Sequence, residues 1–161
     1  MKSIFTFIKS IAILLLISST VFAQADNCSA TFVVENNGYV RSAPITGTYY
    51  SLILTNNGPS DDTYNLVYLN DNTASLKNPD DSSSENNVNL LGTFLNTSKS
   101  VIKSVFIRAG ENVGLFLAIK VPASTGYDLW STSKISAISN KCSSYQVDAT
   151  LHTIVIDVSE Y

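Results

Sequence analysis

The side chains that most often carry out catalysis or bind metal are scarce in this sequence. Its 161 residues include one histidine, His152, and two cysteines, Cys28 and Cys142, which lie far apart. These three residues do not make up a metal-ligand set, and a catalytic His152 would need a nucleophile and an orienting carboxylate nearby. The G-x-S-x-G motif of many hydrolases is absent. We therefore expect no catalytic residues and no enzyme, and we interpret His152 as a half-exposed residue of a strand.

Acidic residues that cluster in two loops, among them two pairs of adjacent aspartates, are the candidates for a metal site. Asp61 and Asp62 form one pair, and Asp80 and Asp81 form the other. If the two segments met at one end of the fold, their oxygens could coordinate Ca²⁺, which prefers carboxylate ligands. Neither pair has the spacing of a known calcium-binding loop. We favour the alternative, that both pairs belong to solvated acidic loops, and we expect no other cofactor.

The aromatic residues support a second hypothesis, a carbohydrate site, because sugar rings stack on exposed aromatic side chains. The chain has eight tyrosines and one tryptophan. The candidates that lie in or near expected loops are Tyr39, Tyr127, Trp130 and Tyr145. The alternative is that aromatic side chains fill a core between sheets. We expect the core position for Trp130, and the sequence leaves both interpretations open for the tyrosines.

Residues 1–23 have the features of a secretory signal peptide. Two lysines supply positive charge, residues 11–17 form an unbroken apolar run, and V-F-A at 21–23 matches a signal-peptidase site. The apolar run is shorter than the roughly 20 residues of a membrane-spanning helix. We therefore expect cleavage before Gln24 and an exported mature chain, secreted, periplasmic or at the cell surface, without a membrane span.

Export changes how the two cysteines are interpreted. An even number of cysteines in an exported protein favours a disulfide over free thiols. A bond between Cys28 and Cys142 would close a very long loop and would stabilise the fold by about 4 to 5 kcal/mol in the chain-entropy description. The alternative is two reduced, buried cysteines that pack as small hydrophobic residues. We expect the disulfide.

Composition and charge narrow the range of partners. Hydrophobic residues make up 45% of the chain and charged residues 14%, and the net charge is −3. No basic patch is present to neutralise the phosphates of a nucleic acid. We therefore expect no nucleic acid as a partner, and we expect an extracellular or periplasmic protein or a glycan instead.

Beyond the signal segment, apolar and polar residues alternate in short runs, which is the pattern of half-buried strands. The clearest run is Val113–Val121, where every second residue is apolar. Asn, Gly, Asp, Ser and Pro separate the runs, and no apolar stripe of helical period is present. We expect further strands near residues 32–35, 50–55, 64–68, 88–95, 101–107, 130–138 and 146–157. This pattern predicts an all-β domain of two packed sheets.

Residues 24–161 have the length of a single domain. One stretch, around residues 70–87, is too polar to bury and too long for a tight hairpin. We predict that it is an exposed loop inserted between two strands.

Two segments carry a resemblance to a known family. The run Y-S-L-I-L-T-N-N-G-P-S-D-D-T at residues 50–63 is similar to the Y-x-I-x-V-x-N-x-G-x-x-D-x-T signature of bacterial immunoglobulin-like modules. Residues 109–126 resemble the P-G-E … V-x-V-P-A-x-x-x-G part of the same modules. They include the conserved-repeat domain of surface proteins (domain of unknown function 11) and the accessory module of some α-galactosidases. This chain has one copy, an insertion and two cysteines.

The resemblance implies an Ig-like antiparallel β-sandwich of about seven to nine strands. It also implies a non-catalytic module that binds or scaffolds at the cell surface or in the periplasm. The alternative is a carbohydrate-binding module that uses exposed aromatic side chains.

Overall fold

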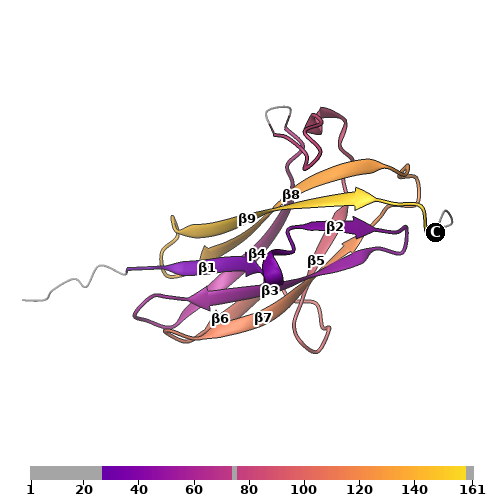
Figure 1. Cartoon of the computed structure of the whole chain (residues 1–161). Coiled ribbons are helices and arrows are strands. Elements are labelled where there is room, and N and C mark those ends of the chain that lie inside the picture. The colour runs from indigo at the N-terminus through magenta and orange to yellow at the C-terminus, as the bar shows by residue number, and fades with distance from the viewer. Residues whose placement is uncertain (1–26, 74–75, 159–161) are drawn as a thin grey trace, which may run out of the picture.

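The structure is a computed structural model that describes residues 27–73 and 76–158 (Figure 1). The predicted signal peptide, residues 1–23, lies outside the described residues. Strands dominate the described chain, and its only helices are two short 3₁₀ turns. The elements are β1 (Ala30–Val34), η1 (Glu35–Asn37), β2 (Val40–Ala43), β3 (Thr48–Asn56), β4 (Asp62–Asn70), η2 (Ser84–Asn86), β5 (Leu91–Leu95), β6 (Ser104–Ile107), β7 (Asn112–Lys120), β8 (Leu129–Ser139) and β9 (Gln146–Val155).

The strands form two sheets that pack face to face. The four-stranded sheet has the order β1-β3-β7-β5, and the five-stranded sheet has the order β2-β9-β8-β4-β6. Neighbouring strands are antiparallel except β2 and β9, which are parallel. The expected fold class, an all-β Ig-like sandwich, is confirmed, and the described residues contain nine strands.

Alternating side chains of both sheets form the core. In β3 and β7 the register pairs Leu52 with Leu115 and Tyr50 with Leu117, and all four side chains are buried. In the opposite sheet, Ile135 of β8 is fully buried as well. Each such side chain contributes roughly 1.5 to 3 kcal/mol through removal of apolar surface from water. The two-residue period seen in the sequence is therefore the period of the core.

The chain changes sheets between β1 and β2. Asn36 and Asn37, in η1, both have positive φ angles of 56° and 54°, a conformation that asparagine tolerates better than most residues. The kink takes the chain from the edge of the four-stranded sheet to the edge of the other sheet, where Val40 pairs with His152. Sequence reasoning missed β2 because its first three residues are exposed and show no alternation.

The insertion between β4 and β5 differs from the predicted exposed loop, because some of its residues are buried and hydrogen-bonded. It projects from the top of the molecule in Figure 1, and Asn78 and Ser84 within it are buried. The amides of Asn78 and Asn87 bond reciprocally at 2.9 and 2.8 Å. The side chain of Asn70 bonds both the N–H and the C=O of Leu90 at 3.0 Å. Hydrogen bonds from side-chain amides therefore take the place of strand-to-strand backbone hydrogen bonds in this segment. As a result, β5 begins at Leu91 rather than at residue 88.

Candidate functional site

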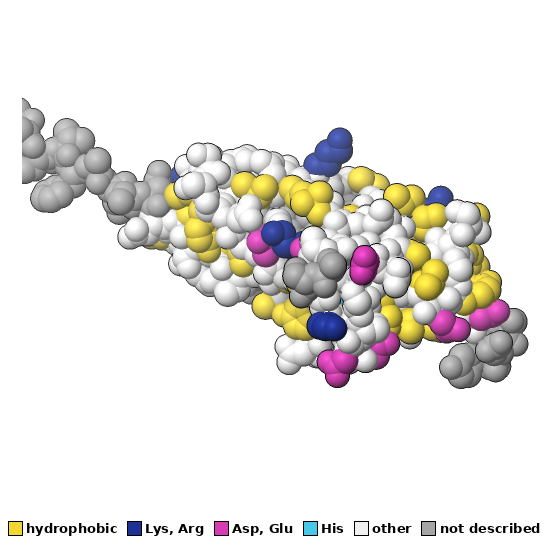
Figure 2. Space-filling view, turned by 90° about the horizontal axis from the view of Figure 1, so that it is seen from above, with side chains coloured by type: hydrophobic (Ala, Val, Ile, Leu, Met, Phe, Trp, Pro, Cys, Tyr) yellow, Lys and Arg dark blue, Asp and Glu magenta, His cyan; other side chains and the backbone are white. Residues whose placement is uncertain are grey.

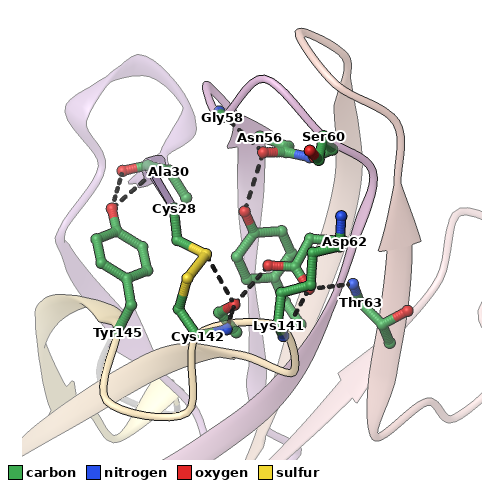
Figure 3. The surroundings of a disulfide bond; sticks show 12 residues. Cys28, Ala30, Asn56, Gly58, Ser60, Asp62, Thr63, Lys141, Cys142 and Tyr145 are labelled. Atoms are coloured by element: carbon green, nitrogen blue, oxygen red, sulfur yellow. Dashed lines mark hydrogen bonds between the residues drawn. A yellow bond between two sulfur atoms is a disulfide. The ribbon is translucent and has the colours of Figure 1, made fainter. Parts of the chain in front are cut away.

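The predicted disulfide between Cys28 and Cys142 is present, and their Cα atoms lie 6.3 Å apart. It ties the segment before β1 to the loop between β8 and β9 (Figure 3). The ring of Tyr145 lies on one side of this bond and the side chain of Asp62 on the other. The Tyr145 hydroxyl accepts a hydrogen bond from the N–H of Ala30 at 2.7 Å, which satisfies a backbone group at the edge of β1. The disulfide is thus embedded in a polar cluster at this end of the sandwich.

Asp62 is a buried carboxylate in this cluster, with 5% of its surface exposed. The Ser139 hydroxyl donates to its Oδ2 at 2.5 Å, and the N–H groups of Thr63 and Lys141 donate to Oδ1 at 2.7 and 3.3 Å. Ser139 Oγ in turn accepts from the N–H of Cys142 at 2.9 Å. Hydrogen bonds therefore satisfy the carboxylate, as a buried charge requires.

Asn56 organises the turn that precedes Asp62. Its amide nitrogen donates to the C=O of Ser60 at 2.8 Å, and its amide oxygen accepts from the N–H of Gly58 at 3.0 Å and from the hydroxyl of Tyr64 at 3.2 Å. These are residues of the segment that resembles the Ig-like signature. A hollow beside them, lined by Asn56 and Asp62 among others, measures only about 10 Å³, which is room for one water. The cluster therefore has a structural role and no space for a ligand.

The two aspartate pairs do not meet. Asp61 and Asp62 lie at the start of β4, whereas Asp80 and Asp81 belong to the insertion that follows the other end of this nine-residue strand. Asp61 Oδ1 accepts from the N–H of Ala109 at 3.0 Å. In residues 27–73 and 76–158, no group of three or more His, Cys, Asp or Glu side chains is placed to hold a metal ion. The arrangement on which the calcium hypothesis depended is not present.

Trp130 does not occupy the expected core position. It alternates with buried Ser131 and Ser133 on β8 and lies half-buried on the outer side of the sheet, next to the insertion. Its Nε1–H donates to Asp80 Oδ2 at 2.9 Å. Hydrogen bonds from Ser82 and from Trp130 lower the pKa of the Asp80 carboxyl. The insertion therefore uses Trp130 as an anchor on this face.

The other predicted aromatic residues are dispersed. Tyr39 packs against the core, Tyr145 lies beside the disulfide, and Tyr127 is exposed in the loop before β8. His152, as expected, is a half-buried residue of β9, and its Nδ1 lies 3.3 Å from the hydroxyl of Thr132. Burial lowers its pKa. The structure does not bring the four predicted aromatic residues together at one site.

Comparisons with known proteins identify no family. No family model and no curated protein matches the chain. Among solved structures, a family 123 glycoside hydrolase from Clostridium perfringens matches 81% of this chain with 12% identity and a TM-score of 0.48. This chain spans only 27% of that protein. The E. coli chaperone DraB matches 80% of this chain at 10% identity and a TM-score of 0.46, over 54% of its own length.

A third similar structure is the CsuC–CsuE chaperone–adhesin complex of Acinetobacter baumannii. It matches 80% of this chain and 57% of its own chain, with 16% identity and a TM-score of 0.43. Likenesses at these levels of identity concern the general shape of the sandwich, and they do not extend to activity, ligand or partner. Within the described part of the chain, no helix has both the length and the hydrophobicity for crossing a membrane.

A surface that the sequence analysis missed lies on the outer side of the four-stranded sheet. Its centre is Tyr49 of β3 and Phe116 of β7, at positions that alternate with core residues. Tyr49 is 52% exposed. The ammonium of Lys99 lies over both rings, 3.4 Å from the centre of Phe116 and 4.7 Å from that of Tyr49. We call these three residues the aromatic–lysine cluster.

Two open hollows flank this cluster. One of about 430 Å³ lies beside Tyr49 and is lined by Ile45, Thr46, Thr48, Thr93, Ala118 and Lys120 among others. The second, of about 240 Å³, lies around Gly114 and includes Glu35 and Phe116. The small side chain of Ala118 leaves room for the first hollow, and the absence of a side chain at Gly114 leaves room for the second. The sequence held one signal for this surface. Tyr49, Ile53 and Phe116 are apolar although they stand at the outward positions of β3 and β7, where polar residues are expected.

Proposed function

We propose that the protein is a non-catalytic, exported binding module and that the outer side of the four-stranded sheet is its binding surface. The observation that carries this proposal is the exposure of large apolar side chains there. Tyr49 is 52% exposed and Leu91 56%, and Val33 and Ile45 are exposed as well. Large apolar side chains gathered on the exposed side of one sheet are a feature of interaction sites.

The opposite face of the sandwich also exposes Val40, Leu69 and Phe106, but the insertion covers part of it. The insertion packs on the outer side of β8 through Trp130 and Asn87, which bonds Thr132 at 3.0 Å. In Figure 2, which looks at the molecule from above, charged groups of both signs and apolar groups are both spread over the visible surface. On the four-stranded sheet, the Lys99 side chain lies over Phe116 and Tyr49 but leaves Tyr49 52% exposed.

Export is the second part of the proposal, and two observations support it. The disulfide is a bond that persists in oxidising compartments outside the cytoplasm. The N-terminal sequence predicts a signal peptide. The resemblance to bacterial Ig-like surface modules agrees with both, and we propose the envelope or the cell exterior as the place of action.

The test compares variants of the two faces. The processed, disulfide-bonded chain is immobilised on a biosensor. It is then exposed to solubilised cell-envelope material from the organism whose genome encodes the protein. We expect Tyr49→Ser to reduce the retained mass severalfold. Phe106→Ser is the matched control, because Phe106 is 59% exposed on β6 of the other sheet. Equal retention by the wild type and Tyr49→Ser would contradict this binding surface.

A further inference from the structure

The geometry points to the ligand that the Tyr49 hollow would take. We propose that the hollow beside Tyr49, flanked by Lys99 and Lys120, binds a uronic-acid unit of an acidic polysaccharide. The inference rests on the proposed function, because it places the ligand on the same face of the four-stranded sheet. It differs from the carbohydrate site expected from the sequence, which used Tyr39, Tyr127, Trp130 and Tyr145.

The position of Lys99 is set by a tight turn. The N–H of Lys99 donates to the C=O of Asn96 at 2.9 Å, and Asn96 Oδ1 accepts from the N–H of Ser100 at the same distance. Lys99 has a φ angle of 61° within this turn, a conformation that few side chains other than Gly, Asn and Asp adopt readily. The turn thereby directs the lysine side chain back over the sheet, onto the rings of Phe116 and Tyr49.

The lining of the hollow suits a sugar. Its volume of about 430 Å³ is within the range of small-ligand sites, roughly 300 to 1,000 Å³. The Tyr49 ring is 52% exposed with the Lys99 ammonium over it, and its uncovered part offers an apolar surface for the C–H face of a pyranose. Thr46, Thr48 and Thr93 line the same hollow, and threonine hydroxyls can bond sugar hydroxyls. An aromatic platform with hydroxyl neighbours is the chemistry that recognises a carbohydrate rather than a purely apolar ligand.

The positive charges of the nearby lysines favour an acidic sugar over a neutral one. Lys120 lines the hollow, and the Lys99 ammonium lies 4.7 Å from the centre of the Tyr49 ring, which also lines it. The ion pairs of the described residues are Arg108–Glu111 and Lys134–Asp148, so both ammonium groups lack a carboxylate partner there. The lining of this hollow contains no acidic residue, although the whole chain has a net charge of −3. A ligand carboxylate would complement the two lysines.

The second hollow is less suited to an acidic ligand than the hollow beside Tyr49. Glu35 lines the space around Gly114, on the other side of Phe116. A carboxylate there would repel an acidic sugar, whereas the one charged residue in the lining of the Tyr49 hollow is Lys120. The two ends of this face therefore differ in charge. Glu35 lies at one end, and Lys120, which would bind the ligand carboxylate, lies at the other.

The test uses defined oligosaccharides and isothermal titration calorimetry with the processed, disulfide-bonded chain. The probes are hexagalacturonate, hexaglucuronate, the full methyl ester of hexagalacturonate, and polyglutamate of matched charge. We expect at least one uronate to bind in a salt-dependent manner. The ester keeps the sugar rings but not the charge, and we expect it to bind about tenfold more weakly, the loss of one charge-assisted contact. Polyglutamate keeps only the charge, and we expect it to bind more weakly than the uronate.

Variants assign the binding to this hollow. We expect Tyr49→Ser and Lys99→Met each to weaken uronate binding by about tenfold, which corresponds to one lost stacking or charge-assisted contact. Tyr49→Phe keeps the ring and should retain binding, and Phe106→Ser should bind as the wild type does. Circular dichroism and thermal unfolding of each variant verify that the fold is unchanged.

Several results would overturn the proposal. They are no binding of either uronate, equal binding of the methyl ester, equal binding of polyglutamate, or unchanged affinity in Tyr49→Ser. The biosensor comparison separates this failure from that of the proposed function. If Tyr49→Ser still loses retention of envelope material while neither uronate binds, the face is a binding surface and only its sugar chemistry is wrong. If retention is unchanged too, both proposals fail.

Discussion

The hydroxyl of Ser139, at the end of β8, donates a hydrogen bond of 2.5 Å to the buried carboxylate of Asp62, at the start of β4. The same hydroxyl accepts from the N–H of Cys142, so the contact joins the disulfide loop to the neighbouring strand. A buried carboxylate is costly unless several donors satisfy it. Ser139 is therefore a key residue of the polar cluster at this end of the sandwich.

Ser139→Ala should destabilise the protein. The substitution removes the side-chain donor of Asp62 and leaves the charge with backbone donors only. We expect the free energy of unfolding to fall by about 1 to 3 kcal/mol, the usual cost of a lost bond to a buried group. Urea unfolding measures this change. Ser144→Ala, an exposed serine of the same loop, is the control, and an equal effect of both substitutions would contradict the role of Ser139.

The disulfide should stabilise the chain through the size of the loop that it closes. The two cysteines are 114 residues apart, and closure of such a loop is worth about 4 to 5 kcal/mol. We expect the Cys28→Ala, Cys142→Ala double variant to unfold at a much lower urea concentration than the wild type. Mass spectrometry without reductant should find the wild-type chain two hydrogens lighter than its reduced form. Full alkylation of the unreduced chain would contradict the bond.

Gly92 of β5 should be sensitive to substitution, because a Cβ there would lie 2.4 Å from the ring of Tyr68. The atoms that it would meet are at the base of the ring, which cannot move aside without displacing the side chain. We expect Gly92→Ala to lower the free energy of unfolding by about 1 to 3 kcal/mol. Gly114→Ala is a matched control, since the nearest atom there is Thr97 Cγ2 at 3.9 Å. Similar losses in both variants, measured by thermal unfolding, would contradict this account.

Alkaline pH should unfold the protein through Tyr50. Burial raises the pKa of this phenol to about 12, and its hydroxyl donates to the C=O of His152 at 2.8 Å. The unfolded chain loses the proton near its ordinary pKa of 10.0, so stability is complete below pH 10 and falls as the pH rises toward 12. A two-unit shift corresponds to about 3 kcal/mol.

The measurement is the free energy of unfolding between pH 9 and about 12. Burial also raises the pKa of Tyr64 to about 12, so Tyr50→Phe should flatten the decline without abolishing it. An equally steep decline in Tyr50→Phe would show that another group controls alkaline unfolding.

The insertion should depend on Asn78. Its amide bonds Ser82, Ser83 and Asn87, and it is buried. We expect Asn78→Ala to open the insertion locally, because unpaired polar groups would remain inside it. Limited proteolysis should then cleave within residues 71–89 severalfold faster than in the wild type, while the core stays folded. Asn86→Ala, at an exposed position of η2, is the control and should be cleaved at the wild-type rate.

Local chemistry explains what could be predicted from the sequence. The alternation in residues 113–121 and the even number of cysteines led to the sandwich and the disulfide, because each depends on side-chain type and on near neighbours. The strand β2 could not be found in this way. Its first three residues are exposed, and its pairing with β9 is made by residues more than a hundred positions later in the chain.

The roles of individual side chains depended on tertiary structure. Trp130 was expected in the core because aromatic side chains usually pack there, but the register of β8 places it outside, where Asp80 bonds it. The aspartate pairs were candidates for one calcium site, and the length of β4 separates them.

The amino-acid sequence alone determined the fold class and the disulfide, since the period of hydrophobic residues and cysteine pairing are properties of the chain itself. Only the tertiary structure decided which face each strand turns to solvent and which distant residues meet there. The cluster of Tyr49, Lys99 and Phe116 comes from a strand, a turn and another strand. No spacing in the sequence encodes their contact, because it arises from the register between β3 and β7 and from the turn that folds back over them.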